Sequence, residues 1–170
     1  MKLRKLKIKD AKMMLEWMHD DFIVHDLLAD FASKSINDCI MFIKCSQSAK
    51  TDINLAIITD DDEYMGTVSL KHIDKSLKEA EFAITIRRVA LGKGYSEFAM
   101  KEVIKIAFKK LKLKKIYWCV SENNHRAIRF YEKQGYKEYK PNEEKKFDRY
   151  QALKMLRWYS IDNNTNGFSG

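Results

Sequence analysis

The sequence predicts an α/β (α+β) fold with a mixed, mostly antiparallel sheet of about six to seven strands, flanked by about four helices. Two observations lead to this class. Three extended apolar runs, at 52–59, 64–73 and 79–86, follow one another with only short turns between them, which is typical of an antiparallel meander. A helical pattern at 97–111 then separates the third run from a buried-type strand at 116–120, and a strand–helix–strand unit indicates a parallel pair.

The first fifty residues predict a strand and two helices. A short strand at 3–8 precedes a helix that Asp10 is expected to cap, and Ser35 opens a second helix that ends near Ser48. The first helix carries large apolar side chains at helical spacing, which favours core packing over a ligand surface: Met13, Met14, Trp17 and Met18.

The segment 19–31, between these helices, mixes aromatic and aliphatic residues with four aspartates: Asp20, Asp21, Asp26 and Asp30. Two interpretations remain open. The segment lines a pocket for a cationic substrate, or it forms a short amphipathic helix with a solvated acidic face.

The meander strands carry two informative details. Gly66, near the start of the second strand, predicts a β-bulge. In the third strand alternate residues point to opposite faces, so that Phe82, Ile84 and Ile86 share one face and Glu81, Ala83 and Thr85 share the other.

The C-terminal third predicts a further helix and two strands. The helix runs from about Asn124 to Gln134, and Gly135 ends it in the left-handed conformation. Strands at 136–140 and 147–159 follow. We expect a single domain at 1–160 and a flexible tail at 161–170.

The composition is that of a globular protein: 45% of the 170 residues are hydrophobic and 33% are charged. The formal charge of +8 suits an anionic partner or, equally, a lysine-rich solvated surface. The three cysteines show no metal-ligand spacing, so we expect reduced thiols and no metal site. No signal peptide or membrane span is recognisable, and a cytoplasmic protein is expected.

A glycine-rich turn, Leu91-Gly92-Lys93-Gly94-Tyr95-Ser96, joins the third meander strand to the long helix. Such a turn presents bare backbone N–H groups at the positive end of the helix dipole, which is favourable for phosphate. By itself it is a weak signal, because most short glycine turns are only turns.

The helix at 124–134 adds a second feature. Asn124 and Tyr131 are seven residues apart, so they share one face at roughly 10 Å along the axis. An amide and a phenol at this spacing suit an extended ligand with amide groups and a reactive end. The competing interpretation is structural, with Asn124 as the N-cap and the ring of Tyr131 packed in the core.

These two motifs together resemble the GNAT superfamily of acetyl-CoA-dependent N-acetyltransferases. The first block runs from Glu81-Phe82-Ala83-Ile84-Thr85-Ile86 to the glycine turn, and the second is Asn124-x-x-Ala-Ile-x-x-Tyr131-Glu-Lys-x-Gly-Tyr136. The details are most similar to the branch that holds ribosomal-protein N-terminal and polyamine acetyltransferases.

The resemblance implies a V-split sheet, the GNAT fold, with acetyl-CoA as cosubstrate in the split. Within the family's pattern the pantetheine arm pairs with the third meander strand, the pyrophosphate lies on the turn, Asn124 contacts the pantetheine arm and Tyr131 lies near the sulfur. The implied cofactor-binding residues are Ile84, Thr85, Ile86, Leu91, Gly92, Lys93, Gly94, Tyr95, Ser96, Asn124 and Tyr131. Two positions depart from the pattern: Leu91 stands where the family usually has Arg or Gln, and Ser96 where it has Gly or Ala.

The chemistry of amine acetylation requires a base for the ammonium proton and an acid for the thiolate that leaves. We expect Tyr131 to be the acid and Glu81 the base or the residue that holds a water, with His72 and Glu79 as weaker alternatives. No covalent intermediate is needed, so Cys119 is expected to be a buried strand residue.

The leading hypothesis is an acetyl-CoA-dependent N-acetyltransferase that acts on a small-molecule amine, an amino sugar or a peptide N-terminus, as a monomer or homodimer. The alternative is a basic module that binds RNA or the ribosome. No lysine and arginine run interleaved with aromatic residues supports nucleic-acid stacking, so a nucleic-acid partner is not favoured, and no membrane partner is expected.

Overall fold

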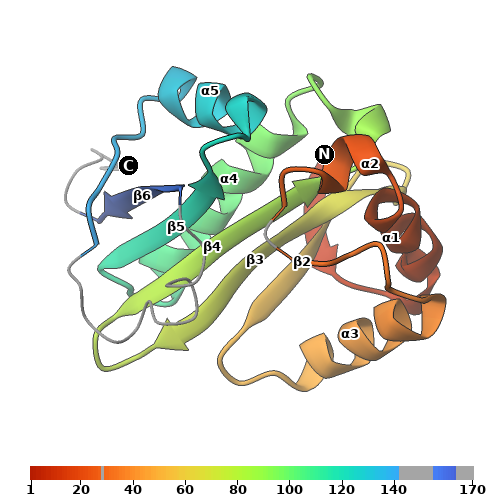
Figure 1. Cartoon of the computed structure of the whole chain (residues 1–170). Coiled ribbons are helices and arrows are strands. Elements are labelled where there is room, and N and C mark those ends of the chain that lie inside the picture. The colour runs from red at the N-terminus through yellow and green to blue at the C-terminus, as the bar shows by residue number, and fades with distance from the viewer. Residues whose placement is uncertain (28, 142–154, 164–170) are drawn as a thin grey trace.

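A computed structural model describes residues 1–27, 29–141 and 155–163, which form a six-stranded sheet with helices on both faces (Figure 1). The strands lie in the sheet in the order of the sequence. Their bounds are β1 Lys2–Lys5, β2 Ile53–Ile58, β3 Tyr64–Asp74, β4 Glu79–Ile86, β5 Lys115–Ser121 and β6 Leu156–Asp162.

The sheet divides between β4 and β5. This pair is parallel and joins only three residue pairs, the last of which is Glu81 with Tyr117, whereas all other neighbouring strands are antiparallel. Beyond Glu81, residues 82–86 of β4 pair only with β3 among the strands of the described residues, and β5 pairs with β6 along its whole length. The predicted mixed sheet with a V-shaped split is therefore confirmed.

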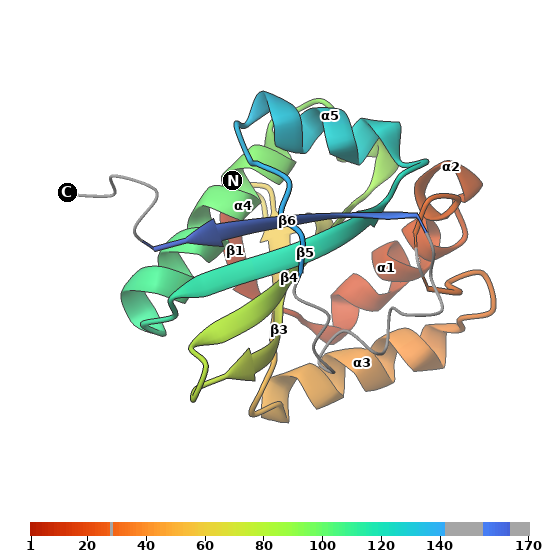
Figure 2. The ribbon, with the colours of Figure 1, turned by 60° about the vertical axis from the view of Figure 1, so that its left-hand side comes forward.

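The helices separate into two layers, each with its own apolar core. The helical segments are η1 Ile8–Asp10, α1 Ala11–Met18, α2 Asp21–Val24, α3 Ile36–Ser48, η2 Arg88–Ala90, α4 Tyr95–Lys105, the π-helical η3 Ile106–Lys110 and α5 His125–Lys133. One core joins α4 and α5 to the sheet, and the other joins α1 and α3 to it. Figure 2 shows the consequence, with α5 above the β5–β6 pair and α3 below β3.

A β-bulge shapes β3 next to the split. Ile57 pairs with Gly66 and Ile58 with Tyr64, so Met65 is the extra residue on β3, next to the predicted position. A Cβ atom on Gly66 would lie 2.3 Å from the carbonyl oxygen of Thr85 on β4. Glycine is thus required here because the two backbones approach closely.

Two arginines, Arg87 and Arg4, connect separate elements of the fold through ion pairs. The guanidinium of Arg87, directly after β4, donates to both carboxylate oxygens of Glu16 on α1 and, at 3.0 Å, to Glu63. Near the N-terminus, Arg4 makes a two-pronged pair with Asp10 at 2.7 and 2.8 Å, and Asp10 is fully buried.

Several predicted boundaries were wrong. The first strand ends at Lys5. Asp10 occupies the N-cap position of α1, but its side chain makes no capping hydrogen bond; its carboxylate instead accepts from the N–H of Lys7 and from Arg4. The predicted strand at 136–140 is a single bridge between Glu138 and Tyr159.

At the C-terminal end, β6 continues to Asp162, so the predicted tail at 161–170 begins later than expected. Residues 142–154, which include most of the predicted strand at 147–159, and residues 164–170 lie outside the described part of the chain. Within the described residues, no helix is both long enough and apolar enough to cross a bilayer.

Candidate active site

The split in the sheet leaves one edge of β4 without a strand partner among the described residues. Phe82, Ile84 and Ile86 turn into the core shared with α4 and α5, as their alternation predicted. The backbone N–H and C=O groups of 82–86 on the side of β5 are therefore available to an extended ligand, because unpaired strand edges accept such pairing readily. Ile84 and Thr85 are half-buried and Ile86 is buried.

The glycine turn lies at the end of this edge. Gly92 and Gly94 have φ angles of 72° and 83°, in the left-handed region that favours glycine, and α4 begins directly after Gly94. The N–H groups of Leu91 and Lys93 donate within the turn, to Arg88 and Ala90. Within this turn, no hydrogen bond to another described residue is made by the N–H groups of Gly92, Gly94, Tyr95 and Ser96.

Four free donors at the N-terminus of an eleven-residue helix form a favourable place for an anion. Space is also present, since no atom lies within 4 Å of the position of a Cβ on Gly92. Leu91 supplies no side-chain donor; its half-buried side chain packs against both cores. The backbone donors of the turn could hold an anion such as a pyrophosphate without a side-chain donor from Leu91.

Asn124 and Tyr131 occupy the two ends of the buried face of α5, as predicted. The Asn124 side-chain oxygen accepts from the N–H of Ala127 at 3.0 Å, so this residue is the N-cap. The ring of Tyr131 packs against those of Trp118 and Tyr159, with centroids 5.3 and 5.1 Å away. Both parts of the structural interpretation are thus observed.

The environment of Tyr131 keeps its phenol protonated. Burial raises the pKa of Tyr131 well above its ordinary value near 10, and the neighbouring Tyr159 acts in the same direction. A general acid must hold its proton until the leaving group needs it, which this phenol does at neutral pH; the same shift makes it a weaker proton donor.

Glu81 lies where β4 and β5 part. It is the last residue of β4 that pairs with β5, it is buried, and it faces the α1 and α3 layer together with Ala83 and Thr85. The two alternative candidates for the base lie elsewhere. His72 is exposed near the end of β3, and Glu79 is the first residue of β4, two residues before Glu81. Cys119 is half-buried on β5 rather than buried.

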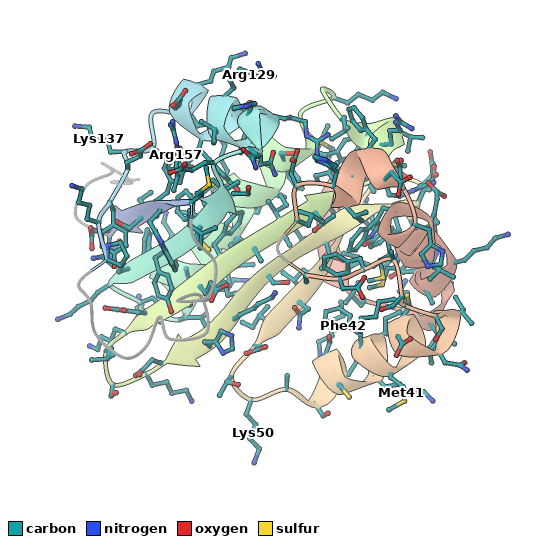
Figure 3. All side chains as sticks on the ribbon, in the orientation of Figure 1. Met41, Phe42, Lys50, Arg129, Lys137 and Arg157 are labelled. Carbon is teal, nitrogen blue, oxygen red and sulfur yellow. The ribbon has the colours of Figure 1, made fainter. Side chains whose placement is uncertain are left out.

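A cavity of about 340 Å³ opens on the same face of β4. Its floor is the polar side of β3 and β4, and its walls come from α1, the loop after α2, and α3. The lining residues are Met14, Trp17, Met18, Phe31, Lys34, Asp38, Phe42, Thr67, Ser69, Lys71, Ala83, Ile84 and Thr85. In Figure 3, Phe42 lies on the side of α3 toward the sheet, whereas its neighbour Met41 points away.

Over the part of the chain that the structure describes, the lining of this cavity includes none of the aspartates of the segment 19–31. Asp20 caps α2 by accepting from the N–H of Phe22, Asp26 contacts His25, and Asp30 accepts from Ser33. Of this segment, Phe31 lines the cavity, and Asp21–Val24 form the short helix α2 that the other interpretation expected.

A bridge across the mouth of the split was not anticipated from the sequence. The exposed ring of Phe22 on α2 has the guanidinium carbons of Arg88 and Arg126 at 4.4 and 5.0 Å from its centroid. Arg126 belongs to the first turn of α5 and Arg88 follows β4, so the contact joins the two arms of the split, whose ribbons face each other in Figure 1. Nothing in the local sequence pattern around Phe22 could have identified it.

A mixed sheet split beside a glycine turn, with an asparagine and a tyrosine on the next helix, is the architecture expected of the GNAT class. The chain belongs to this family, since residues 1–137 match the model of the acetyltransferase (GNAT) domain. Family membership does not favour the alternative of a basic RNA-binding module.

Among characterised relatives, the spermidine N(1)-acetyltransferase of Escherichia coli (strain K12) is 30% identical over 127 residues, which are 75% of this chain and 62% of that protein. The match thus spans slightly less than two thirds of the relative's length. A crystal structure of spermidine N-acetyltransferase from Vibrio cholerae with CoA and spermine superposes with a TM-score of 0.78 at 20% identity, over 95% of this chain and 94% of that one. The crystal structure of a probable acetyltransferase superposes with a TM-score of 0.76 at 20% identity, over 95% of this chain and 92% of that chain. At these identities the two structures support the fold.

Proposed function

We propose that the chain transfers the acetyl group of acetyl-CoA to a primary amine, by direct attack in a ternary complex. The observation that carries this proposal is the continuous track formed by the unpaired edge of β4 and the glycine turn at its end. The edge can pair with the amide groups of a pantetheine arm, and the turn offers backbone donors and a helix dipole to the pyrophosphate.

The acceptor amine would occupy the cavity under α1 and α3. That cavity is bordered by Ala83, Ile84 and Thr85, the same stretch of β4 whose edge would hold the cofactor. An amine in the cavity and a thioester in the split would therefore meet across this strand. Holding the two reactants in this way converts a bimolecular reaction into one within a complex.

The proposed chemistry uses two side chains of this chain. The amine gives up its proton to Glu81, directly or through a water, and the N–C bond forms as the C–S bond of the thioester breaks. The sulfur takes a proton from Tyr131, which yields the free thiol of CoA. Backbone N–H groups at the edge of β4 would stabilise the negative charge on the carbonyl oxygen during the transfer.

The test is a pair of measurements on the purified chain. Acetyl-CoA should raise the melting temperature by a few degrees, because a ligand that binds only the folded state stabilises it. Thiol release from acetyl-CoA should then appear with at least one member of a panel of primary amines and disappear without an amine. No thermal shift at millimolar acetyl-CoA, together with no thiol release, would contradict the proposal.

A further inference from the structure

Thr85 places a hydroxyl in the lining of the cavity under α1 and α3, beside the open edge of β4. Its side chain alternates with those of Ile84 and Ile86, which pack in the core of α4 and α5, so it points into the cavity, where it is half-buried. The thioester would lie at the edge of 84–86, and the acceptor amine would approach from the cavity. Thr85 therefore lies where the two reactants of the proposed function would meet.

Three hydroxyl groups line this cavity over the described part of the chain, and two of them are used inside the protein. The hydroxyl of Thr67 bonds with that of Tyr64 at 2.7 Å. The hydroxyl of Ser69 donates to the side-chain oxygen of Asn54 at 2.6 Å. Thr85 is the cross-strand partner of Thr67, but its own hydroxyl makes no hydrogen bond with any residue that the structure describes. It is thus available to a ligand.

The aromatic wall of the cavity supplies no acceptor for an N–H group of a ligand. The rings of Trp17 and Phe31 meet edge to face with centroids 5.1 Å apart. The indole N–H of Trp17 donates to the buried hydroxyl of Tyr64 at 3.1 Å, so this residue offers the cavity only the apolar surface of its ring. Because a buried N–H without an acceptor is costly, an amine against this wall needs an acceptor on the sheet side of the cavity.

Attack on the thioester requires a neutral nitrogen whose lone pair points at the carbonyl carbon. The two N–H bonds of a neutral primary amine then point away from that carbon. A hydroxyl oxygen that accepts from one of these N–H groups fixes the rotation of the nitrogen, whichever group takes the ammonium proton. The hydroxyl itself is too weak a base to remove that proton.

We propose that the hydroxyl of Thr85 accepts a hydrogen bond from the acceptor amine and thereby directs the lone pair of the nitrogen at the acetyl group. The inference rests on the proposed function and adds a residue that orients the nucleophile in the same site. The N–C bond forms and the C–S bond breaks as described above. Thr85 forms no covalent bond and gives up no proton in this step.

The variant Thr85→Val tests the inference, because valine keeps the branched shape of threonine and carries a methyl group in place of the hydroxyl. Thiol release is measured with 2-phenylethylamine, spermidine and a peptide with a free N-terminus, and the variants are compared on the amine that reacts fastest. We expect Thr85→Val to lower kcat roughly fivefold or more, with a smaller change in KM for the amine. Thr85→Ser, which keeps the hydroxyl, should recover most of the loss.

Binding of acetyl-CoA, measured by calorimetry, separates the amine from the acetyl donor as the partner of this hydroxyl. Thr85→Val should bind acetyl-CoA within about twofold of the unmodified chain, since the substituted side chain faces the cavity rather than the edge. Clearly weaker binding would place the hydroxyl on the donor and overturn the inference. The control Thr51→Val makes the same substitution at an exposed residue before β2 and should leave kcat and KM unchanged.

The remaining outcomes separate the inference from the proposed function. An unchanged kcat in Thr85→Val, or a loss that falls wholly on KM, would overturn the orienting role and leave the acetyltransferase intact. A loss of kcat that Thr85→Ser does not reduce would assign the effect to packing and would also overturn the inference. An unmodified chain that acetylates none of the three amines and is not stabilised by acetyl-CoA would refute both.

Discussion

Replacement of Tyr131 by phenylalanine separates its chemical role from its structural one. The ring contacts with Trp118 and Tyr159 depend on the ring alone, and among the described residues the hydroxyl makes no hydrogen bond. Loss of the hydroxyl therefore removes no internal partner, and we expect the free energy of unfolding to change by less than about 1 kcal/mol. Loss of a general acid should lower kcat roughly 10²- to 10⁴-fold, or by about 2.7–5.5 kcal/mol in the activation barrier.

The assay is thiol release at saturating acetyl-CoA and amine, with denaturant unfolding and acetyl-CoA affinity measured on the same preparation. The matched control is Tyr136→Phe, whose ring belongs to the same cluster with its centroid 6.4 Å from that of Tyr131. The control should retain kcat within about twofold. A normal kcat in Tyr131→Phe would show that this phenol is not the acid, and an equal loss in both variants would indicate a packing defect instead.

Three further substitutions test other parts of the structure. Gly66→Ala places a Cβ atom 2.3 Å from a carbonyl oxygen of β4, so it should lower the free energy of unfolding by about 1–3 kcal/mol and weaken acetyl-CoA binding. Arg4→Met leaves the carboxylate of Asp10 buried without its cation, and denaturant unfolding should register a loss of about 3–5 kcal/mol. Arg126→Gln removes a positive group from the mouth of the split; we expect calorimetry to give a dissociation constant for acetyl-CoA raised roughly threefold to tenfold at low salt, with a weaker dependence on salt.

Each substitution has a control. Gly135→Ala forces a positive φ on alanine at the C-terminal end of α5, so it should lower stability without lowering acetyl-CoA affinity. Adding Asp10→Asn to Arg4→Met should recover part of the lost stability, and a single-variant loss below about 1 kcal/mol would contradict the buried-pair argument. Arg129→Gln, on the part of α5 that Figure 3 shows pointing outward, should leave binding unchanged.

The conformations of the glycine turn and of α5 could be predicted from the sequence because their signals are local. Positive-φ glycines, an N-cap asparagine and a tyrosine two turns later are each fixed by their own segment. Their order carried the resemblance to the GNAT superfamily, and that resemblance implied the split beside β4. The details that failed were those in which distant residues compete, as when Arg4 and the N–H of Lys7 bind the carboxylate of Asp10, which was expected to cap α1.

The cavity proposed for the acceptor could not be predicted, because residues that are distant in the sequence form it. Trp17, Phe42 and Lys71 come from α1, α3 and β3, and only the tertiary structure brings them around one cavity. The aspartates of 19–31 were considered as part of a pocket lining, but three of them form hydrogen bonds with residues close to them in the sequence. Composition identifies charged side chains but not the direction in which they point.

The most direct test of the account is hydrogen–deuterium exchange of the backbone amides with and without acetyl-CoA. The account predicts slower exchange in two places when acetyl-CoA is added: at the turn residues 92–96, whose free N–H groups would bind the pyrophosphate, and at 84–86 on the open edge of β4. Exchange in β1, Lys2–Lys5, at the far side of the sheet, should not change. Unchanged exchange at 84–86 and 92–96 under millimolar acetyl-CoA would contradict the central claim that the split in the sheet holds the acetyl donor.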